Sequence, residues 1–162
     1  MLRPAAAADA PAALELIREG FASYRAFGIP GWEPPDEPMH GFAERLAAGW
    51  GAVVEDGGEV VGFGAFEQAL EHPRAGAEVP GLAHVWAVFV TQTHWGTEVA
   101  TTLLAALTEE IGRQGYIEAR LFTPAPQARA RRFYAREGWH EAGEPVHVEA
   151  LGLDMVELRR PV

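Results

Sequence analysis

The sequence predicts a mixed α/β (α+β) fold, with about six to seven strands in a central sheet and about four helices flanking it. Two β-rich runs on either side of Asp56-Gly57-Gly58 indicate an antiparallel hairpin. The unbroken apolar run 85–90 is typical of a strand that is covered on both faces. Apolar residues then recur every four positions from Val99 to Ile111, which is a helical period. Antiparallel pairing followed by strands that alternate with helices gives a mixed sheet.

Composition narrows the class of protein. The 162 residues suit one domain covering 1–162 with a hydrophobic core of its own. The formal net charge of −10 argues against a nucleic-acid partner, which needs a basic surface. The chain has no cysteine and no apolar run of the roughly 20 residues that span a bilayer, so we expect neither disulfides nor a membrane partner. The default expectation for location is the cytoplasm.

The first half of the chain predicts a strand, two helices and a loop. Residues 1–3 fit a short first strand, and Asp9 is a good cap for a helix over 10–19. Residues 23–38 are rich in proline, glycine and aromatic residues, so they predict an irregular loop of a kind that is often functional. Residues 42–50 fit a second helix.

A hairpin and a second loop follow. The hairpin covers residues 51–67, and Gly62 and Gly64 in its second strand suggest a bulge. Residues 70–81 contain His72, Pro73, Gly76 and Pro80, so they predict a loop rather than strands.

The second half of the chain alternates strands with helices. Prolines precede its last helix, and a glycine follows it as a stop signal. The predicted elements are a strand over 85–90, a helix from 96 to Gly112 or Gly115, a strand over 116–122, a helix from Pro124 or Pro126 to Gly138, and final strands over 139–141 and 151–159.

The corner between the strand at 85–90 and the following helix predicts an anion site. The first N–H groups of a helix have no intrahelical partner, and the positive end of the helix dipole lies beside them. Gly96 allows a bulky ligand to approach the backbone there. An ordinary strand–turn–helix corner has the same local pattern.

Two motifs, over residues 90–104 and 127–139, together resemble the GNAT superfamily of acyl-CoA-dependent N-acetyltransferases. The first is Val90-Thr-Gln-Thr-His-Trp-Gly-Thr-Glu-Val-Ala-Thr-Thr-Leu-Leu104, which resembles a strand-ending valine, a short turn and Arg/Gln-x-x-Gly-x-Gly/Ala before a Leu-Leu helix. The second is Gln127-Ala-Arg-Ala-Arg-Arg-Phe-Tyr-Ala-Arg-Glu-Gly-Trp139, which resembles Asn-x-x-Ala-x-x-Phe-Tyr followed by Gly-Phe. The order of elements resembles that of the family over nearly the whole chain.

The resemblance implies acetyl-CoA as co-substrate and no metal. It implies that strand backbone pairs with the pantetheine arm, that N–H groups after the strand cradle the pyrophosphate, and that the residue in place of the family's Asn contacts pantetheine. The cofactor-binding residues implied in this way are Val88, Phe89, Val90, Trp95, Gly96, Thr97, Glu98, Val99, Ala100 and Gln127.

Two positions depart from the family pattern. Trp95 stands where the phosphate motif has Arg or Gln, and Glu98 stands at its central glycine. A carboxylate beside a pyrophosphate repels it unless the side chain turns outward. Glu98 also fits an ordinary acidic residue in the first turn of a helix, where the dipole favours it.

The resemblance also implies the catalytic groups. Tyr134 occupies the position of a tyrosine that protonates the departing thiolate, a role that suits a phenol. His84 occupies the strand position at which several members carry a general base, and an imidazole can take a proton from an ammonium directly or through water. Strand alternation predicts that His84, Trp86, Val88 and Val90 share one face. A structural histidine at a strand start is the alternative.

The acceptor is expected to be a primary amine of a small molecule or peptide. Tyr24, Phe27 and Trp32 fit walls of its pocket, although core packing accounts for them equally well. Glu67, His147 and Glu149 are weaker candidates for a base or an amine contact, and the arginines from Arg129 to Arg136 fit either a phosphate contact or a solvated helix face. A homodimer is common among family members. A catalytically inactive GNAT-fold ligand-binding or interaction module is the alternative function.

Overall fold

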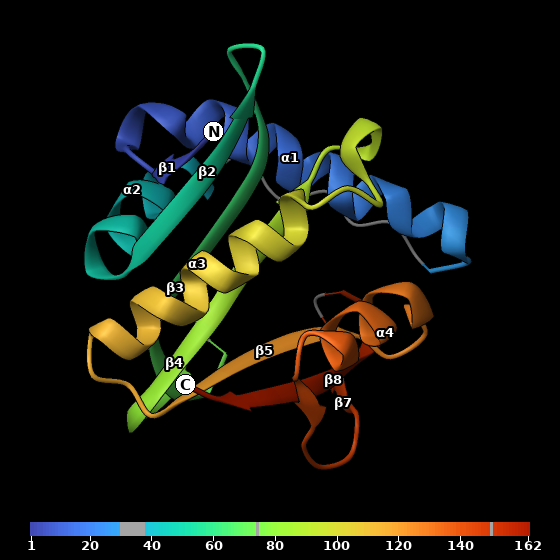
Figure 1. The fold of residues 1–162 in the computed structure, drawn as a ribbon. Coiled ribbons are helices and arrows are strands. Elements are labelled where there is room, and N and C mark those ends of the chain that lie inside the picture. The colour runs from blue at the N-terminus through green and yellow to red at the C-terminus, as the bar shows by residue number, and fades with distance from the viewer. Residues whose placement is uncertain (30–37, 74, 150) are drawn as a thin grey trace.

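An eight-stranded sheet runs through the computed structural model, which describes residues 1–29, 38–73, 75–149 and 151–162 (Figure 1). The strand order is β1-β2-β3-β4-β5-β8-β6, and β7 also pairs with β8. All of these pairs are antiparallel except β4–β5, so the predicted mixed sheet is confirmed. The count exceeds the predicted six to seven because β7 adds a short segment along β8 that the sequence did not indicate. The strands are β1 Leu2–Pro4, β2 Trp50–Asp56, β3 Glu59–His72, β4 Ala75–Val90, β5 Glu118–Pro124, β6 His140–Glu141, β7 Val146–Val148 and β8 Leu153–Pro161.

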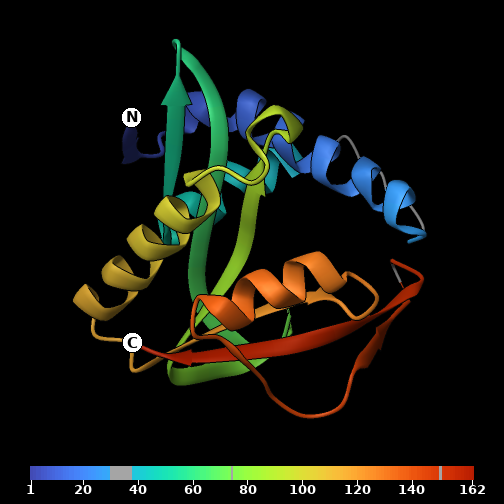
Figure 2. The ribbon, with the colours of Figure 1, turned by 45° about the vertical axis from the view of Figure 1, so that its right-hand side comes forward.

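Helices cover both faces of the sheet, as predicted. Ala65 packs with α1 and α2, whereas the next residue, Phe66, packs with α3 on the opposite face. Figure 2 shows α4 beside β5 and β8, apart from the group formed by β1–β4 and the other helices. Among the described helices, none combines the length and apolar character that a membrane crossing requires. The α-helices are α1 Ala10–Ser23, α2 Pro38–Ala48, α3 Val99–Arg113 and α4 Ala128–Arg136.

The β2–β3 hairpin forms where the sequence predicts it. Gly57 and Gly58 have φ values of 58° and 85°, as the tight turn of a twisted hairpin requires. The predicted bulge lies beside Gly62, where Val54 pairs with Gly62 but Glu55 pairs with Val60, whereas Gly64 pairs regularly with Ala52 and Val88. A Cβ at Gly62 would lie 2.7 Å from Cγ1 of Val99, and one at Gly64 would lie 2.9 Å from Cδ1 of Leu107, so these glycines allow α3 to pack closely on the sheet.

The loop predicted over residues 70–81 is wrong, because β3 continues to His72 and β4 begins at Ala75. Prolines do not prevent this hairpin, because Pro80 lies where the register of the two strands shifts and no regular ladder bond is needed. The side-chain amide of Gln68 donates there to the carbonyls of Val79 at 2.8 Å and Leu82 at 3.2 Å.

A bulge in β4 changes which side chains share a face. Ala65 pairs with Ala87 but Phe66 pairs with Val85, so Trp86 is an extra residue. As a result Val85 and Val88 both pack on the α3 side, whereas Trp86 packs on the α1 and α2 side. The prediction that His84, Trp86, Val88 and Val90 share one face is therefore wrong.

The parallel pair β4–β5 is short, and this creates the site. Pairing covers Leu82 to His84 on β4 and Glu118 to Arg120 on β5. Beyond this point β5 continues to pair with β8, while β4 continues along β3. The two strands therefore diverge, and the edge of β4 from Val85 to Val90 faces the gap between them.

Candidate active site

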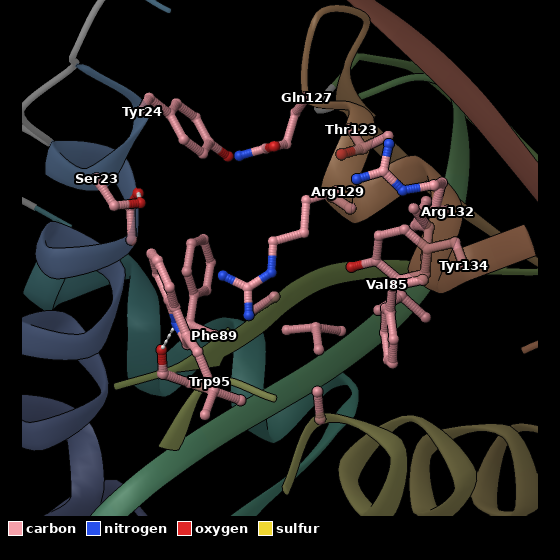
Figure 3. A pocket seen from close by; sticks show the side chains of 18 of the residues that line it. Ser23, Tyr24, Val85, Phe89, Trp95, Thr123, Gln127, Arg129, Arg132 and Tyr134 are labelled. Carbon is pink, nitrogen blue, oxygen red and sulfur yellow. Dashed lines mark hydrogen bonds between the residues drawn. The ribbon is translucent and has the colours of Figure 1, made fainter. Parts of the chain in front are cut away.

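A cavity of about 640 Å³ lies where β4 and β5 diverge (Figure 3). Its walls come from the end of α1, the diverging part of β4, the connection between β4 and α3, the end of β5, and α4. Segments from both halves of the chain meet there, so only the folded sheet forms the cavity.

The open edge of β4 forms one wall. The N–H of Thr91 donates to the carbonyl of Val61 at 3.0 Å, and Val90 pairs with Gly62. Because successive residues of an antiparallel strand direct their backbone groups to opposite sides, those of Val88 and Val90 face the cavity and those of Phe89 face β3. Two of the three backbone positions predicted to contact pantetheine are therefore oriented toward the cavity.

The connection between β4 and α3 uses some of its own N–H groups. The N–H of Trp95 donates to Gln92 at 3.1 Å and that of Thr97 donates to His94 at 3.2 Å, whereas the hydroxyl of Thr97 receives the N–H of Val99 at 3.4 Å. These three residues were predicted to offer their N–H groups to a ligand, and the structure turns those groups to partners within the loop.

Other donors in this loop stay available. In the described part of the chain the N–H groups of Gly96, Glu98 and Ala100 donate no hydrogen bond to a backbone carbonyl. Gly96 has φ of 81°, which favours glycine, and both Gly96 and Ala100 line the cavity. The start of α3 therefore keeps the character of an anion site.

Glu98 turns away from this site. It is the N-cap residue of α3, its side chain is exposed, and it does not line the cavity. Val99 does not line the cavity either and packs instead against the core of Ala52, Val54, Val61 and Leu103. The carboxylate at the family's glycine position thus points outward rather than at the cavity.

Arginines on α4 form a basic wall opposite β4. Arg129, Arg132 and Arg136 line the cavity, because residues three or four positions apart lie on one face of a helix. Arg131 points elsewhere and donates to Glu141 at 2.8 Å and to the carbonyl of Ala125 at 2.8 Å. Among the described residues that line the cavity none is acidic, so its charge favours an anionic ligand.

Two tyrosines reach the cavity from different walls. Tyr134 projects from α4, and Tyr24 projects from the 3₁₀ turn Tyr24–Phe27 that follows α1 (Figure 3). Burial raises the pKa of the Tyr134 hydroxyl well above its usual range, and the nearby Tyr24 hydroxyl raises it further. Burial also raises the pKa of Tyr24 to about 12. Both phenols therefore keep their protons at neutral pH.

Gln127 lies at the N-cap position of α4, with its side chain buried and projecting into the cavity. Its side chain does not cap the helix, so the amide is directed to the cavity rather than to the backbone of α4. Gln127 therefore lines the cavity, and its contact with a ligand stays a prediction.

His84 lies in the last residue pair that β4 forms with β5 before the two strands diverge. Its ring is buried on the α2 side of the sheet, and Nδ1 accepts a hydrogen bond from Nε of Arg120 at 3.4 Å. Because arginine only donates, the neutral imidazole in this contact carries its proton on Nε2. The ring does not line the cavity, but its centroid lies 5.9 Å from that of Phe122, which does.

The predicted acceptor-binding residues separate into two groups. Tyr24 and Phe27 line the cavity, and Trp32 lies outside the described residues. Glu67 accepts from Arg45 at 2.9 and 2.5 Å, and His147 pairs with Asp154 at 2.8 Å; neither Glu67 nor His147 lines the cavity.

Sequence reasoning missed several residues of the site. Ser23, Phe122 and Thr123 line the cavity. The last two lie at the carboxyl end of β5, and the rule that ligands bind at the carboxyl ends of parallel strands would have indicated them. Glu19 was missed too, and it accepts hydrogen bonds from the hydroxyl of Thr91 at 3.1 Å and from the N–H of Gln92 at 2.6 Å. No local signal marks its role, since it depends on α1 lying beside the end of β4.

Metal ligands are not gathered in the described part of the chain. No group of three or more His, Asp or Glu side chains there is placed to hold a metal ion.

Comparison with known proteins gives one family match. The model of the acetyltransferase (GNAT) family matches residues 15–139. That range contains the diverging strands, the anion site at the start of α3, and α4 with its tyrosine. No curated protein sequence matches the chain.

Solved structures share the fold. Ribosomal-protein-alanine N-acetyltransferase from Brucella melitensis superposes with a TM-score of 0.79 at 20% identity, covering 100% of this chain and 99% of that one. The yncA protein of Salmonella typhimurium, solved with acetyl-CoA, has a TM-score of 0.77 at 18% identity, covering 99% and 92%. The paia N-acetyltransferase of Thermoplasma acidophilum, solved with coenzyme A, has a TM-score of 0.72 at 13% identity, covering 100% and 98%. At these identities the likeness extends to the fold.

Proposed function

Because the chain belongs to the GNAT acetyltransferase family, we propose that it transfers an acetyl group from acetyl-CoA to a primary amine of a small molecule or a peptide. The observation that carries this proposal is the cavity between β4 and β5, which combines an open strand edge, an anion site and a half-buried tyrosine. We further propose that residues 1–162 act as one domain in this reaction.

The cavity suits the shape and charge of acetyl-CoA. The pantetheine arm carries amides, which can pair with the outward-facing backbone groups of Val88 and Val90 as an added strand would. The N–H groups of Gly96 and Ala100 and the dipole of α3 favour the diphosphate. Arg132 and Arg136 add positive charge on the facing wall.

Tyr134 is proposed to act as the general acid. Acetyl-CoA supplies an activated thioester, and its thiolate must receive a proton when it leaves. The Tyr134 hydroxyl projects into the cavity, and its raised pKa keeps a proton available there. A backbone N–H of the open β4 edge can hold the carbonyl oxygen as negative charge develops on it.

His84 is proposed to receive the proton of the attacking amine, directly or through water. Its position on β4 beside the point of divergence supports this role, and its ring lies against Phe122 of the cavity wall. The contact of His84 with Arg120 sets a condition for proton uptake at Nδ1. Protonation of Nδ1 requires the donor Nε of Arg120 to move away, because two donors cannot share that hydrogen bond.

A binding module without catalysis is the second candidate function. Trp95 favours it, since its indole N–H already donates to the carbonyl of Val90 at 2.9 Å on the open edge. Tyr134, which projects into the cavity with a proton to donate, favours the enzyme.

Isothermal titration with acetyl-CoA, followed by a thiol-release assay over a panel of amines and peptides, tests the proposal. We expect saturable binding and release of free CoA with at least one primary amine. Absence of binding at millimolar acetyl-CoA would exclude the enzyme. Binding without turnover on any amine of the panel would favour the module.

A further inference from the structure

Trp95 contacts the elements around the mouth of the cavity. Its indole N–H donates to the carbonyl of Val90 at 2.9 Å. The guanidinium carbon of Arg129 lies 4.7 Å from the centroid of the indole, and the ring of Phe27 lies 6.1 Å from it. Trp95 thus joins β4, α4 and the turn after α1 through one side chain.

These contacts fall across the cavity rather than behind its wall. Trp95, Arg129 and Phe27 all line it, and Figure 3 shows Arg129 extending from α4 across the cavity to the indole. The carbonyl of Val90 faces the cavity and not β3. The indole N–H of Trp95 therefore bonds to an acceptor on the open edge of β4.

We propose that Trp95 and Arg129 form a latch over the cofactor cleft, in which the indole holds the Val90 carbonyl until acetyl-CoA displaces it. The inference rests on the proposed function. The open edge of β4 offers the carbonyl of Val90 as an acceptor to an extended ligand that carries amides, and the indole N–H competes for that carbonyl while the latch is closed. We therefore expect the indole N–H to leave Val90 when acetyl-CoA binds.

The chemistry of the ligand provides the means of opening. A guanidinium stacked on an indole makes a weaker contact than a charge-assisted hydrogen bond to a phosphate. The diphosphate can therefore draw Arg129 from the indole, and an amide N–H of the ligand can replace that of Trp95 on Val90. Each protein contact that is lost has a ligand contact in its place, so the latch lowers affinity without preventing binding.

Substitution of Trp95 by phenylalanine separates the hydrogen bond from the stacking. The Trp95→Phe variant keeps a ring for Arg129 and Phe27 but has no donor for Val90. We expect it to bind acetyl-CoA about three- to tenfold more tightly than the wild type in isothermal titration, the range expected when one competing hydrogen bond is removed. Trp50→Phe is the matched control, because Trp50 packs against Phe66 away from the cavity and should leave affinity unchanged.

Indole NMR provides an independent readout. The chain has five tryptophans, so the signal that disappears in the Trp95→Phe variant identifies the Trp95 N–H. We expect hydrogen exchange of this N–H to be slow in the free protein and faster when acetyl-CoA is bound. Equal or weaker binding by the variant, or an indole N–H that stays protected in the complex, would overturn the latch. If neither protein binds acetyl-CoA, the proposed function itself fails, whereas equal binding by both removes the latch alone.

Discussion

Arg120 and His84 are neighbours on the two strands that separate to form the cavity, and Nε of Arg120 donates to Nδ1 of His84 at 3.4 Å. The arginine is buried, and Nη1 also donates to the carbonyl of Leu70 at 2.8 Å. This pair fixes the imidazole at the point of divergence. It also means that a substitution of His84 changes both a titratable group and an acceptor for a buried cation.

Substitution of His84 by asparagine separates these two roles. The amide oxygen of asparagine lies near the position of Nδ1, so it can still accept from Arg120, but it does not take up a proton at neutral pH. If His84 is the general base, the His84→Asn variant should lose about 100-fold or more in kcat/KM while keeping its fold. Steady-state kinetics together with thermal unfolding provide the measurement.

The His84→Ala variant is the companion to this test. It removes the acceptor of Nε of buried Arg120, while the bond from Nη1 to Leu70 remains, so we expect a loss of about 1–3 kcal/mol in the free energy of unfolding, which the asparagine variant avoids. Full activity in the asparagine variant would show that His84 positions Arg120 and that water removes the proton.

The Tyr134→Phe variant tests the general acid. Loss of the hydroxyl removes the proton that the leaving thiolate needs, whereas the ring keeps its edge contacts with Phe133 and Trp139. We expect kcat to fall by about 100-fold, with the acetyl-CoA Kd changed by less than about twofold. Single-turnover kinetics and isothermal titration separate the two quantities. The Tyr116→Phe variant is the control, because Tyr116 packs against the core and does not line the cavity, and an unchanged kcat in Tyr134→Phe would contradict the acid role.

Periodicity in the sequence predicts most of the fold. Two local patterns are visible in a single sequence: the apolar run that forms the end of β4 and the four-residue repeat of α3. The hairpin over residues 70–81 and the bulge at Trp86 were missed because both depend on pairing between distant strands. That bulge also reversed the predicted face of Val88 relative to His84.

The sequence predicts those residues of the candidate site that belong to a motif. It does not predict those whose position depends on contacts between elements that are distant in the sequence. Gln127 and Tyr134 line the cavity as the resemblance implies, and Tyr24 lines it too. Glu67 looked available in the sequence, but α2 brings Arg45 to it. Which N–H groups of the loop from Trp95 onward stay free depends on turns whose geometry no propensity specifies.

Glu19 provides a test of how α1 positions the cofactor loop. Its carboxylate accepts from the hydroxyl of Thr91 and from the N–H of Gln92, where β4 ends and the anion site begins, but it does not line the cavity. Loss of this tie in the Glu19→Ala variant should weaken acetyl-CoA binding by about three- to tenfold and raise KM more than it lowers kcat.

Two further variants control for general damage to α1. Glu15 lies one turn earlier and pairs with Arg18 on the helix surface, so Glu15→Ala should leave acetyl-CoA affinity unchanged. Glu19→Gln keeps an acceptor and should restore part of the affinity. Equal affinity in Glu19→Ala and the wild type would exclude the positioning role.

Alkaline titration examines the buried phenols without interference from other side chains. The chain has neither lysine nor cysteine, so its three tyrosines are the side chains that titrate at moderately alkaline pH. Burial raises the pKa of Tyr24 to about 12 and moves the pKa of Tyr116 and Tyr134 in the same direction. We expect tyrosinate absorbance in the native protein to appear above about pH 10, the value of a free phenol.

The same shifts predict how stability depends on pH. A phenol whose pKa is higher in the folded chain binds its proton more tightly there. Its contribution to the free energy of unfolding is therefore fully present below the unfolded pKa of about 10. As the pH rises from about 10 toward the folded value of about 12 for Tyr24, the unfolded chain ionises first and the free energy of unfolding falls. Urea unfolding across this range measures the slope, and the Tyr24→Phe variant should show a smaller one. A native absorbance midpoint near pH 10 for all three tyrosines would contradict the burial of Tyr24 and Tyr134 in the cavity wall.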